Sequence, residues 1–395
     1  MRILLASSAS YAPPRGGSTR SNLAWLRHLA GAGHACRIVC GGDAGGDFTA
    51  LADNIEVKPV PDGSARAAAL RHEIATWSPD WVLVSSEDLS HTLLRAAARG
   101  AANRLVYIAH TPQFFPFGPE SWNADQPAAG IVRGAAGVVA ISKFVAGYVE
   151  RELGVQPAVI HPPIYGAPPH PRYRNFEQGL VLMINPCEVK GIDILLGLAQ
   201  RLPHVEFGAL RGWGTTRRDA QRIEASPNIR LLEPVRDIDE LLRATRVLLM
   251  PSLWCEGFGL IVMEALLRGV PVVASNSGGL AEAKAGTHYV VPVAPIERYG
   301  LEFDENHLPK VVVAPQDIAA WVTALERLLT DAAEYDAESG RSIAASRQFV
   351  AGLDAARFEH YLLNLQPAVP RPAAGELSAA RRALLEKMLR AKGRP

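Results

Sequence analysis

Two carboxylates flank a glycine-rich turn in the segment 247–282. An apolar strand is expected just before the turn at residues 256–259, and a helix is expected to begin near Leu260. Glu256 and Glu264 are eight positions apart, about two helical turns, so both can lie on one face of this unit. Glycines let backbone N–H groups approach a ligand, and a helix N-terminus favours a phosphate. The pattern indicates carboxylates that bind hydroxyl groups beside amides that bind an anion.

The elements that must position these residues alternate along the chain. Short apolar runs alternate with helical stretches in both halves, which favours parallel sheets built from β-α-β units. The segment 161–179, which is rich in proline, separates the halves. The sequence therefore predicts an α/β fold of two Rossmann-like domains facing across a cleft, with ligands at the carboxyl ends of the strands. His110 follows the strand expected at 105–109, so its side chain should point into this cleft.

The block from Glu256 to Glu282 resembles the signature of the retaining glycosyltransferases of family 4 (glycosyltransferase group 1), which have the GT-B fold. Surface glutamates beside an ordinary turn are the alternative, and the length of the match disfavours it. The matching residues are Glu256, Gly257, Phe258, Gly259, Leu260, Glu264, Ala265, Gly269, Pro271, Val272, Val273, Ala274, Ser275, Gly278, Gly279, Leu280 and Glu282.

This resemblance implies a role for each part of the block. Glu256 would contact the donor sugar beside the reacting centre, and Glu264 would hold the ribose hydroxyls of a nucleotide sugar. Gly16 and Gly17 match a glycine pair that approaches the diphosphate from the first domain. The backbone amides that would meet the diphosphate or the donor sugar belong to Gly257, Phe258, Gly259 and Leu260.

The segment 185–191, NPCEVKG, matches a second motif of the family. The family usually has an arginine five residues before a Lys-Gly pair, and both cations neutralise the leaving diphosphate. Lys190 matches the lysine, but Asn185 stands where the arginine is expected. Because asparagine carries no charge, Arg211 in the RGWG turn is the candidate for the second cation. For Lys190 and Arg211 the alternative is an ordinary solvated cation.

His110 matches a cleft histidine that the family places near the acceptor or the donor sugar, and a structural cap of the strand is the alternative. The resemblance thus makes Glu256, His110 and Lys190 the candidate catalytic residues. Four aromatic residues follow, and they form either a wall for the acceptor or ordinary loop packing: Phe114, Phe115, Phe117 and Trp122.

Composition excludes several other classes of protein. The net charge is +1, which argues against a dedicated nucleic-acid binder. The four cysteines are too few for a disulfide scaffold, so a reducing cytoplasm is expected. No stretch approaches the ~18–20 apolar residues of a membrane span. The histidines show no metal-binding spacing, so no metal site is expected. Asp237 and Asp239 match the D-x-D of metal-dependent transferases, but they open an expected helix, where aspartate is a favoured N-cap. We therefore expect a metal-independent reaction with no cofactor besides the nucleotide-diphosphate sugar.

The expected organisation has four parts, the last of which carries a basic, amphipathic stretch from Glu376 to Lys392. That stretch is predicted to pack on the body, to dock a partner or to contact a membrane surface. Its brief similarity to segments that precede condensation domains of peptide synthetases hints at natural-product biosynthesis. The parts are an acceptor-binding domain (1–168), a nucleotide-sugar domain (178–350), a helix that crosses back (351–366) and a proline-rich tail (367–395).

The sequence therefore predicts a retaining glycosyltransferase that moves a sugar from a nucleotide-diphosphate sugar to an acceptor hydroxyl. Two alternatives remain open. One is a GT-B enzyme that transfers to no acceptor, such as a nucleotide-sugar epimerase or a phosphorylase. The other is a non-catalytic binding protein on the same scaffold.

Overall fold

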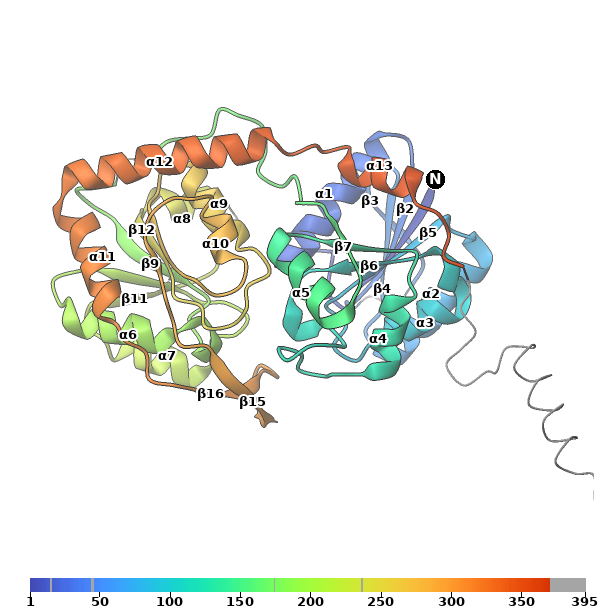
Figure 1. The fold of residues 1–395 in the computed structure, drawn as a ribbon, viewed down its shortest axis with the longest axis horizontal. Helices are drawn as coiled ribbons and strands as arrows, with labels where there is room; N and C mark the ends of the chain where they lie inside the picture. The colour runs from blue at the N-terminus through green and yellow to red at the C-terminus, as the bar shows by residue number, and fades with distance from the viewer. Residues whose placement is uncertain (15, 44–45, 174, 236, 370–395) are drawn as a thin grey trace, which may run out of the picture.

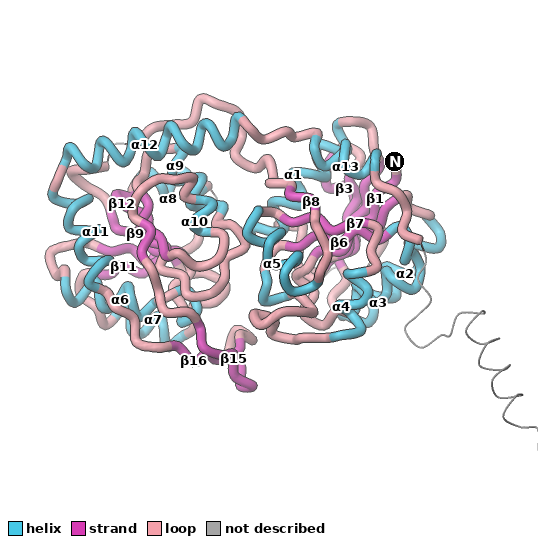
Figure 2. Tube along the Cα trace, in the orientation of Figure 1, coloured by secondary structure: helices cyan, strands magenta, loops and turns pink. Residues whose placement is uncertain are grey.

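Two parallel β-sheets, one in each half of the chain, organise the molecule into two domains (Figure 1). The structure is a computed structural model that describes residues 1–369 apart from positions 15, 44–45, 174 and 236. Helices surround each sheet, as the tube in Figure 2 shows. Parallel strands covered on both faces are apolar throughout, which is why β5 (Trp81–Ser85) and β6 (Leu105–Ala109) are buried along their whole length.

The first domain is built on an eight-stranded sheet in the order β3-β4-β2-β1-β5-β6-β7-β8, parallel except between β3 and β4. The order reverses between β1 and β5, so a crevice is expected at the carboxyl ends of these strands. The other strands are β1 (Arg2–Ala6), β2 (Ala35–Cys40), β3 (Thr49–Ala52), β4 (Ile55–Pro59), β7 (Gly137–Ala140) and β8 (Ala158–Val159). The helices are α1 (Gly17–Gly31), α2 (Gly63–Trp77), α3 (Thr92–Ala101), α4 (Gln126–Arg133) and α5 (Lys143–Leu153), with 3-10 turns at Ala102–Arg104 and Pro112–Phe114.

The second domain is built on a six-stranded parallel sheet in the order β11-β10-β9-β12-β13-β14. Its order reverses between β9 and β12, and the loops after these two strands carry Lys190 and Glu256. The strands are β9 (Leu180–Ile184), β10 (Phe207–Leu210), β11 (Ile229–Leu232), β12 (Thr245–Met250), β13 (Val272–Ser275) and β14 (Val290–Val291). The helices are α6 (Ile192–Arg201), α7 (Arg217–Glu224), α8 (Ile238–Arg243), α9 (Leu260–Leu267), α10 (Leu280–Ala283), α11 (Ala319–Thr330) and α12 (Ala332–Ala351), with a 3-10 turn at Glu188–Lys190.

Two further elements join the domains. An antiparallel hairpin, β15 (Ile296–Phe303) and β16 (Pro309–Val313), leaves the second domain after β14. After α12 the chain returns to the first domain, where α13 (Arg357–Asn364) packs against α1 (Figure 1). There the Phe358 ring stacks on Trp25 at 4.9 Å, and Glu359 Oε1 lies 2.9 Å from His34 Nε2.

The predicted α/β fold with two Rossmann-like halves is confirmed. Several elements were not predicted, among them α2, α4, α11, α12 and the hairpin. Helix α2 has an alanine-rich sequence with little contrast between its faces, and the register of the hairpin is interrupted by irregularities. In the described part of the chain, no helix combines the length and apolar character that crossing a membrane requires. The tail from Glu376 to Lys392 lies outside the described residues.

Candidate active site

Lys190 and Glu256 meet at the carboxyl edge of the second sheet. Lys190 Nζ lies 2.5 Å from Glu256 Oε1, which also accepts a hydrogen bond from Ser252 Oγ at 2.8 Å. The same ammonium lies 4.0 Å from the centre of the Trp254 ring. The two side chains are only 13% and 12% exposed, so little water screens their attraction and each charge depends on the other.

Glu264, on α9, faces the first domain. Its Oε1 accepts a hydrogen bond at 2.6 Å from Nη2 of Arg20, a residue of α1. Its Oε2 is buried and has no hydrogen-bond partner among the residues that the structure describes. An unpaired carboxylate oxygen inside a protein is costly, so this atom is suited to accept a hydrogen bond from a ligand hydroxyl.

His110 belongs to a buried polar network of the first domain. Its Nε2 lies 3.0 Å from Oδ1 of Asn22, whose amide nitrogen donates to the hydroxyls of Tyr11 at 2.7 Å and Ser85 at 2.9 Å. In this arrangement Nε2 carries the proton. The buried Nδ1, which no described residue contacts by a hydrogen bond, is then an acceptor. Burial lowers the pKa of His110, against the opposing effect of Glu87, so the ring is neutral near pH 7.

Close contacts bring predicted site residues of the two domains together. A Cβ added at Gly257 would lie 2.1 Å from the carbonyl oxygen of His110, so only glycine fits there. A Cβ at Gly17 would lie 3.0 Å from Cδ1 of Leu260. In addition, Ser142 Oγ donates a hydrogen bond to the Gly257 carbonyl at 2.6 Å. The structure therefore places the turn after β12 directly against the loop after β6.

The helices α1 and α9 both begin at this junction. Their N-cap residues, Gly16 and Gly259, have φ angles of 88° and 99°. Among the described residues, no side chain caps either helix start. Uncapped helix starts leave backbone N–H groups for an anion. Phe258 is buried and its ring stacks on Phe349 at 5.5 Å, so its side chain anchors the turn and its backbone remains for ligand binding.

Asn185 closes the turn that contains Arg211. Its φ is 57°, and its Oδ1 accepts a hydrogen bond from the Gly214 N–H at 2.8 Å. A Cβ at Gly212 would lie 2.4 Å from the same oxygen, so the glycine turn packs directly on the asparagine. Arg211 points to Glu233, with 3.2 Å between Nε and Oε1. Its role as the second cation stays a prediction.

The aromatic residues that follow His110 divide into two pairs. Phe115 and Phe117 are buried in the core of the first domain, which fits loop packing. Phe114 and Trp122 pack on each other, and Trp122 contacts Trp254 of the second domain, with ring centres 5.6 Å apart. The interpretation as a cleft wall therefore remains for this second pair.

Glu282 joins the two domains in a way that sequence reasoning missed. It accepts hydrogen bonds from the first amides of α5, those of Lys143 at 3.1 Å and Phe144 at 3.0 Å. His161 Nε2 lies 2.7 Å from its Oε1. Burial tends to raise the pKa of Glu282, but these contacts hold it below its usual value. The sequence marked Glu282 only as part of the family block. Its contacts were not predicted, because its partners are far away along the chain.

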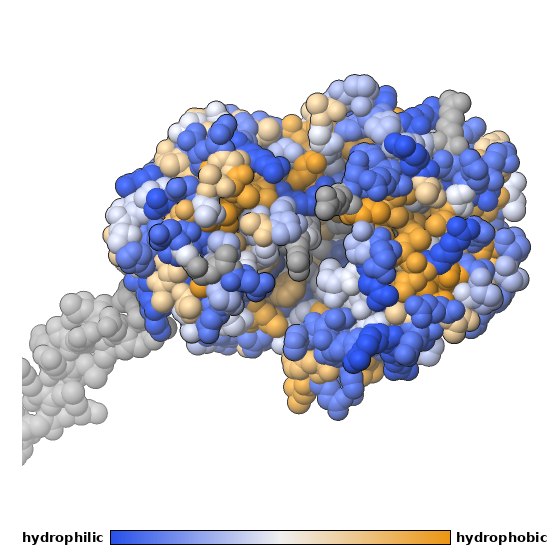
Figure 3. All heavy atoms as spheres, turned by 180° about the vertical axis from the view of Figure 1, so that it is seen from behind, coloured by the Kyte–Doolittle hydropathy of each residue, from blue (hydrophilic) through white to orange (hydrophobic). Residues whose placement is uncertain are grey.

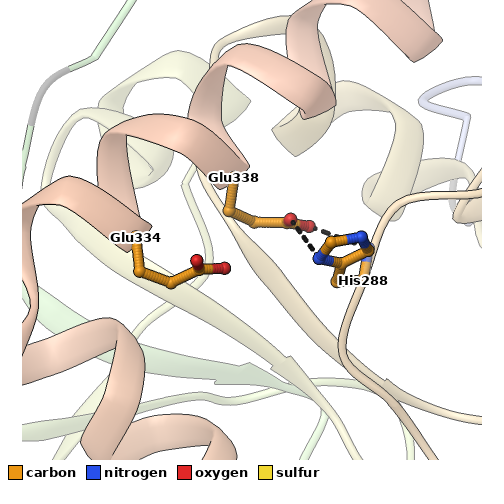
Figure 4. A group of neighbouring side chains, drawn as sticks. All are labelled: His288, Glu334 and Glu338. Carbon is orange, nitrogen blue, oxygen red and sulfur yellow. Dashed lines mark hydrogen bonds and ion pairs between the residues drawn. The ribbon is translucent and has the colours of Figure 1, made fainter.

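One group of possible metal ligands is present among the described residues: His288, Glu334 and Glu338 (Figure 4). Cations already neutralise its carboxylates. Arg341 donates to Glu334 Oε1 at 2.7 Å and to Glu338 Oε2 at 2.8 Å, and Lys284 Nζ lies 3.9 Å from Glu338 Oε1. We therefore assign this group a structural role, and metal independence stays a prediction.

The arrangement can bind a phosphorylated, hydroxyl-rich ligand. Lys190 and the starts of α1 and α9 supply positive charge and N–H donors, which suit a diphosphate. Glu256 and Glu264 supply acceptors for hydroxyl groups. His110 adds a neutral acceptor from the opposite domain. Seen from behind, the surface is hollowed where the two domains meet (Figure 3).

Two family models match the chain, one in each domain. Residues 15–165 match the model described as "Glycosyltransferase Family 4". Residues 180–331 match the model described as "Glycosyl transferases group 1".

Curated relatives match parts of the chain. The lipopolysaccharide core biosynthesis mannosyltransferase LpsB of Rhizobium meliloti is 25% identical over 195 residues, 49% of this chain and 48% of that protein. The D-inositol 3-phosphate glycosyltransferase of Salinispora arenicola is 30% identical over 141 residues, 34% of this chain and 27% of that protein. The matched segments thus span about half of the first relative and about a quarter of the second.

Solved structures share the fold at low sequence identity. Sucrose-phosphate synthase from Thermosynechococcus elongatus has a TM-score of 0.65 at 15% identity and covers 100% of both chains. HepE of Anabaena in complex with UDP-glucose has a TM-score of 0.62 at 16% identity, covering 92% of this chain and 98% of that one. WaaG, a glycosyltransferase involved in lipopolysaccharide biosynthesis, has a TM-score of 0.61 at 15% identity, with the same coverage.

Proposed function

The chain belongs to the family 4 and group 1 glycosyltransferases, and from this premise we propose that it transfers a sugar from a nucleotide-diphosphate sugar to an acceptor hydroxyl. The observation that carries the proposal is the largely buried ion pair of Lys190 and Glu256, next to the Gly257 that touches the His110 carbonyl. In this proposal residues 1–168 bind the acceptor and residues 178–350 bind the donor. The UDP-glucose complex of HepE supports a nucleotide-sugar donor.

Each residue of the site has a role in this reaction. Lys190 and the uncapped starts of α1 and α9 would stabilise the negative charge of the leaving diphosphate. Glu256, released from Lys190 by the incoming phosphate, would accept hydrogen bonds from the donor sugar. The unpaired Oε2 of Glu264 would accept a hydrogen bond from the ribose, and Nδ1 of His110 would accept one from a sugar hydroxyl.

We propose a retaining, metal-independent reaction. The acceptor oxygen forms a bond to the anomeric carbon on the face that the diphosphate leaves, and the bond from that carbon to the phosphate oxygen breaks. The departing phosphate takes the proton of the acceptor hydroxyl. Contact between the domains excludes water that would otherwise hydrolyse the donor. The names of LpsB and WaaG, which refer to lipopolysaccharide biosynthesis, support a role in glycoconjugate biosynthesis. A role in natural-product biosynthesis and a location in the cytoplasm stay predictions.

A thermal-shift screen of UDP, GDP and dTDP sugars tests the proposal. A donor at about 100 times its Kd should stabilise the protein by about 2.7 kcal/mol, an increase of a few degrees in Tm. NMR of the product, with and without EDTA, then determines the anomeric configuration and the need for metal. Isomerisation of the nucleotide sugar alone would instead indicate an epimerase, and binding without turnover would indicate a binding protein. No stabilisation by any of these sugars would contradict the proposal.

A further inference from the structure

The hairpin β15–β16 lies at the junction of the two domains (Figures 1 and 2). Its base is packed, because Ile296 and Val311 contact a small core formed by Cys187, Val189 and Trp254. Its far end is open to solvent, where Leu301 is 97% exposed. Figure 3 shows the hairpin projecting at the lower edge of the molecule.

Tyr299, on β15, connects this hairpin to the first domain. Its hydroxyl accepts a hydrogen bond from Gln113 Nε2 at 3.2 Å and donates one to Glu120 Oε2 at 3.0 Å. Its ring lies edge-on to Trp122, with ring centres 5.9 Å apart. Burial and then Glu120 raise the pKa of Tyr299, so the hydroxyl keeps its proton and remains a donor.

The cluster around Tyr299 is next to the proposed reacting centre. Gln113 follows His110 by three residues, and Trp122 packs against Trp254. Lys190 Nζ in turn lies 4.0 Å from the centre of the Trp254 ring. An acceptor that approaches a sugar held at Lys190 from the side of the first domain would therefore meet this cluster.

Three polar atoms in the cluster have no hydrogen-bond partner in the described part of the chain. They are Gln113 Oε1, Trp122 Nε1 and Trp254 Nε1. Gln113 is 0% exposed and Trp254 is 4% exposed, so water does not replace the missing partners. Buried polar groups are normally paired, and three unpaired ones in one place indicate a binding surface. One acceptor and two donors among aromatic faces suit a ring that carries several hydroxyl groups.

The charges around the cluster indicate which class of ligand it can bind. The Glu120 carboxylate contacts Tyr299 and takes part in no ion pair among the described residues. Lys190, the cation on Trp254, is already paired with Glu256. Burial and then Glu120 also raise the pKa of Cys255 to about 12, so this thiol stays neutral near pH 7. This environment repels an anionic group and accepts a neutral one.

We propose that Gln113, Glu120, Trp122 and Tyr299 form the acceptor subsite, which takes an uncharged, polyhydroxylated ring such as a sugar or a cyclitol. The hairpin supplies one wall of this subsite and so sets the selectivity for the acceptor. Because the unpaired atoms are covered in this structure, the ring enters when the hairpin and the first domain separate. The inference rests on the proposed function for its place in the reaction.

Saturation-transfer NMR on the full chain tests the subsite. The probes are methyl α-D-glucopyranoside, myo-inositol and D-glucose 6-phosphate, each with and without UDP, GDP or dTDP. We expect transfer to at least one neutral ring, and at least tenfold weaker binding of the phosphorylated sugar. Tyr299→Phe removes one hydroxyl and should weaken neutral binding about threefold to tenfold, and Trp122→Ala should weaken it more.

Tyr289→Phe is the matched control, because its hydroxyl also donates to a glutamate, Glu334 Oε1 at 2.9 Å, away from the cluster. It should leave binding unchanged, and the Tm of every variant reports on folding. The subsite is wrong if no neutral ring shows transfer, if the phosphorylated sugar binds as well, or if Tyr299→Phe and Trp122→Ala behave like the control. If nucleotide sugars still raise the Tm in that case, the subsite fails while the proposed function stands.

Discussion

The two faces of the cleft hold their polar groups in different ways. On the second domain, Lys190 and Glu256 are charged and neutralise each other directly. On the first domain, His110 is neutral, and Asn22 fixes its ring through a hydrogen bond. An ion pair can exchange its partners for a charged ligand, whereas a neutral network keeps its geometry when a ligand arrives. The difference suggests that the second domain binds the charged part of the ligand and that the first domain fixes the position of the reacting groups.

Glu256→Gln removes the negative charge from the face of the second domain and has the largest expected effect on kcat. The variant keeps the shape of the side chain but leaves Lys190 without its counter-charge and removes a strong acceptor. We expect kcat to fall about 10²–10³-fold in a transfer assay. The control is Glu206→Gln, which changes an exposed pair with Arg230 at 2.5 Å and should alter kcat less than twofold. A Glu256→Gln variant with more than a tenth of the original kcat would contradict the assignment.

Gly257→Ala would push the two faces of the cleft apart and leave their charges unchanged. Its methyl group would lie 2.1 Å from the His110 carbonyl, so the loop after β6 must move by about 1 Å. A displacement of this size can cost about 10²-fold in rate. The comparison variant is Gly147→Ala on α5, where the added Cβ meets nothing within 4 Å. Equal kcat values for the two variants would show that contact between the faces is not needed.

The neutral face predicts a pH dependence of stability. The pKa of His110 is lowered from 6.5 in the folded state, so the unfolded chain binds a proton first as the pH falls. The stability linked to His110 is therefore complete above about pH 6.5 and is lost below it. Urea unfolding from pH 7.5 to 5.0 should show a steeper loss of unfolding free energy in the original protein than in His110→Gln. Identical slopes would mean that the ring is not held neutral.

Lys284, a buried residue outside the cleft, should have the smallest effect on kcat. It tests whether only the residues of the two cleft faces affect the reaction. Burial lowers the pKa of Lys284 from 10.5 to about 8, against the opposing effect of Glu338. Between these values the unfolded chain binds the proton and the folded protein does not, so stability should rise with pH. Urea unfolding from pH 7.5 to 9.5 should show this rise, and Lys284→Met should lack it. Unlike the cleft variants, Lys284→Met should keep kcat within twofold, and a larger loss would link this residue to the site.

The sequence predicted the sheets better than the surface elements. Strands buried on both faces, such as β5 and β6, read as continuous apolar runs and needed no tertiary information. The hairpin β15–β16 mixes charged and apolar residues, and its contacts lie in distant segments of both domains. Tyr299 and Gln113 are 186 residues apart, so no local pattern marks their contact.

In the candidate site, too, local motifs were predicted and contacts between distant segments were not. Glu256, Gly257 and Lys190 belong to short local motifs, and the structure brings all three together. Arg20 was not predicted, because its partner Glu264 lies 244 residues away. Asn22 was missed for the same reason, being 88 residues from His110. Side-chain pairing between domains depends on distance in space, and sequence spacing does not report that distance.

The sequence by itself determined the types of elements, the glycine turns and the residues able to bind hydroxyl groups and phosphate. These features depend on backbone sterics and on the period of apolar residues, which act over a few positions. Only the tertiary structure decided that Lys190 is neutralised by Glu256, that Nδ1 of His110 is the free acceptor, and that the hairpin reaches the first domain. Those outcomes depend on burial and on partners from distant segments, because removal from water makes each charge or polar atom depend on its particular neighbours.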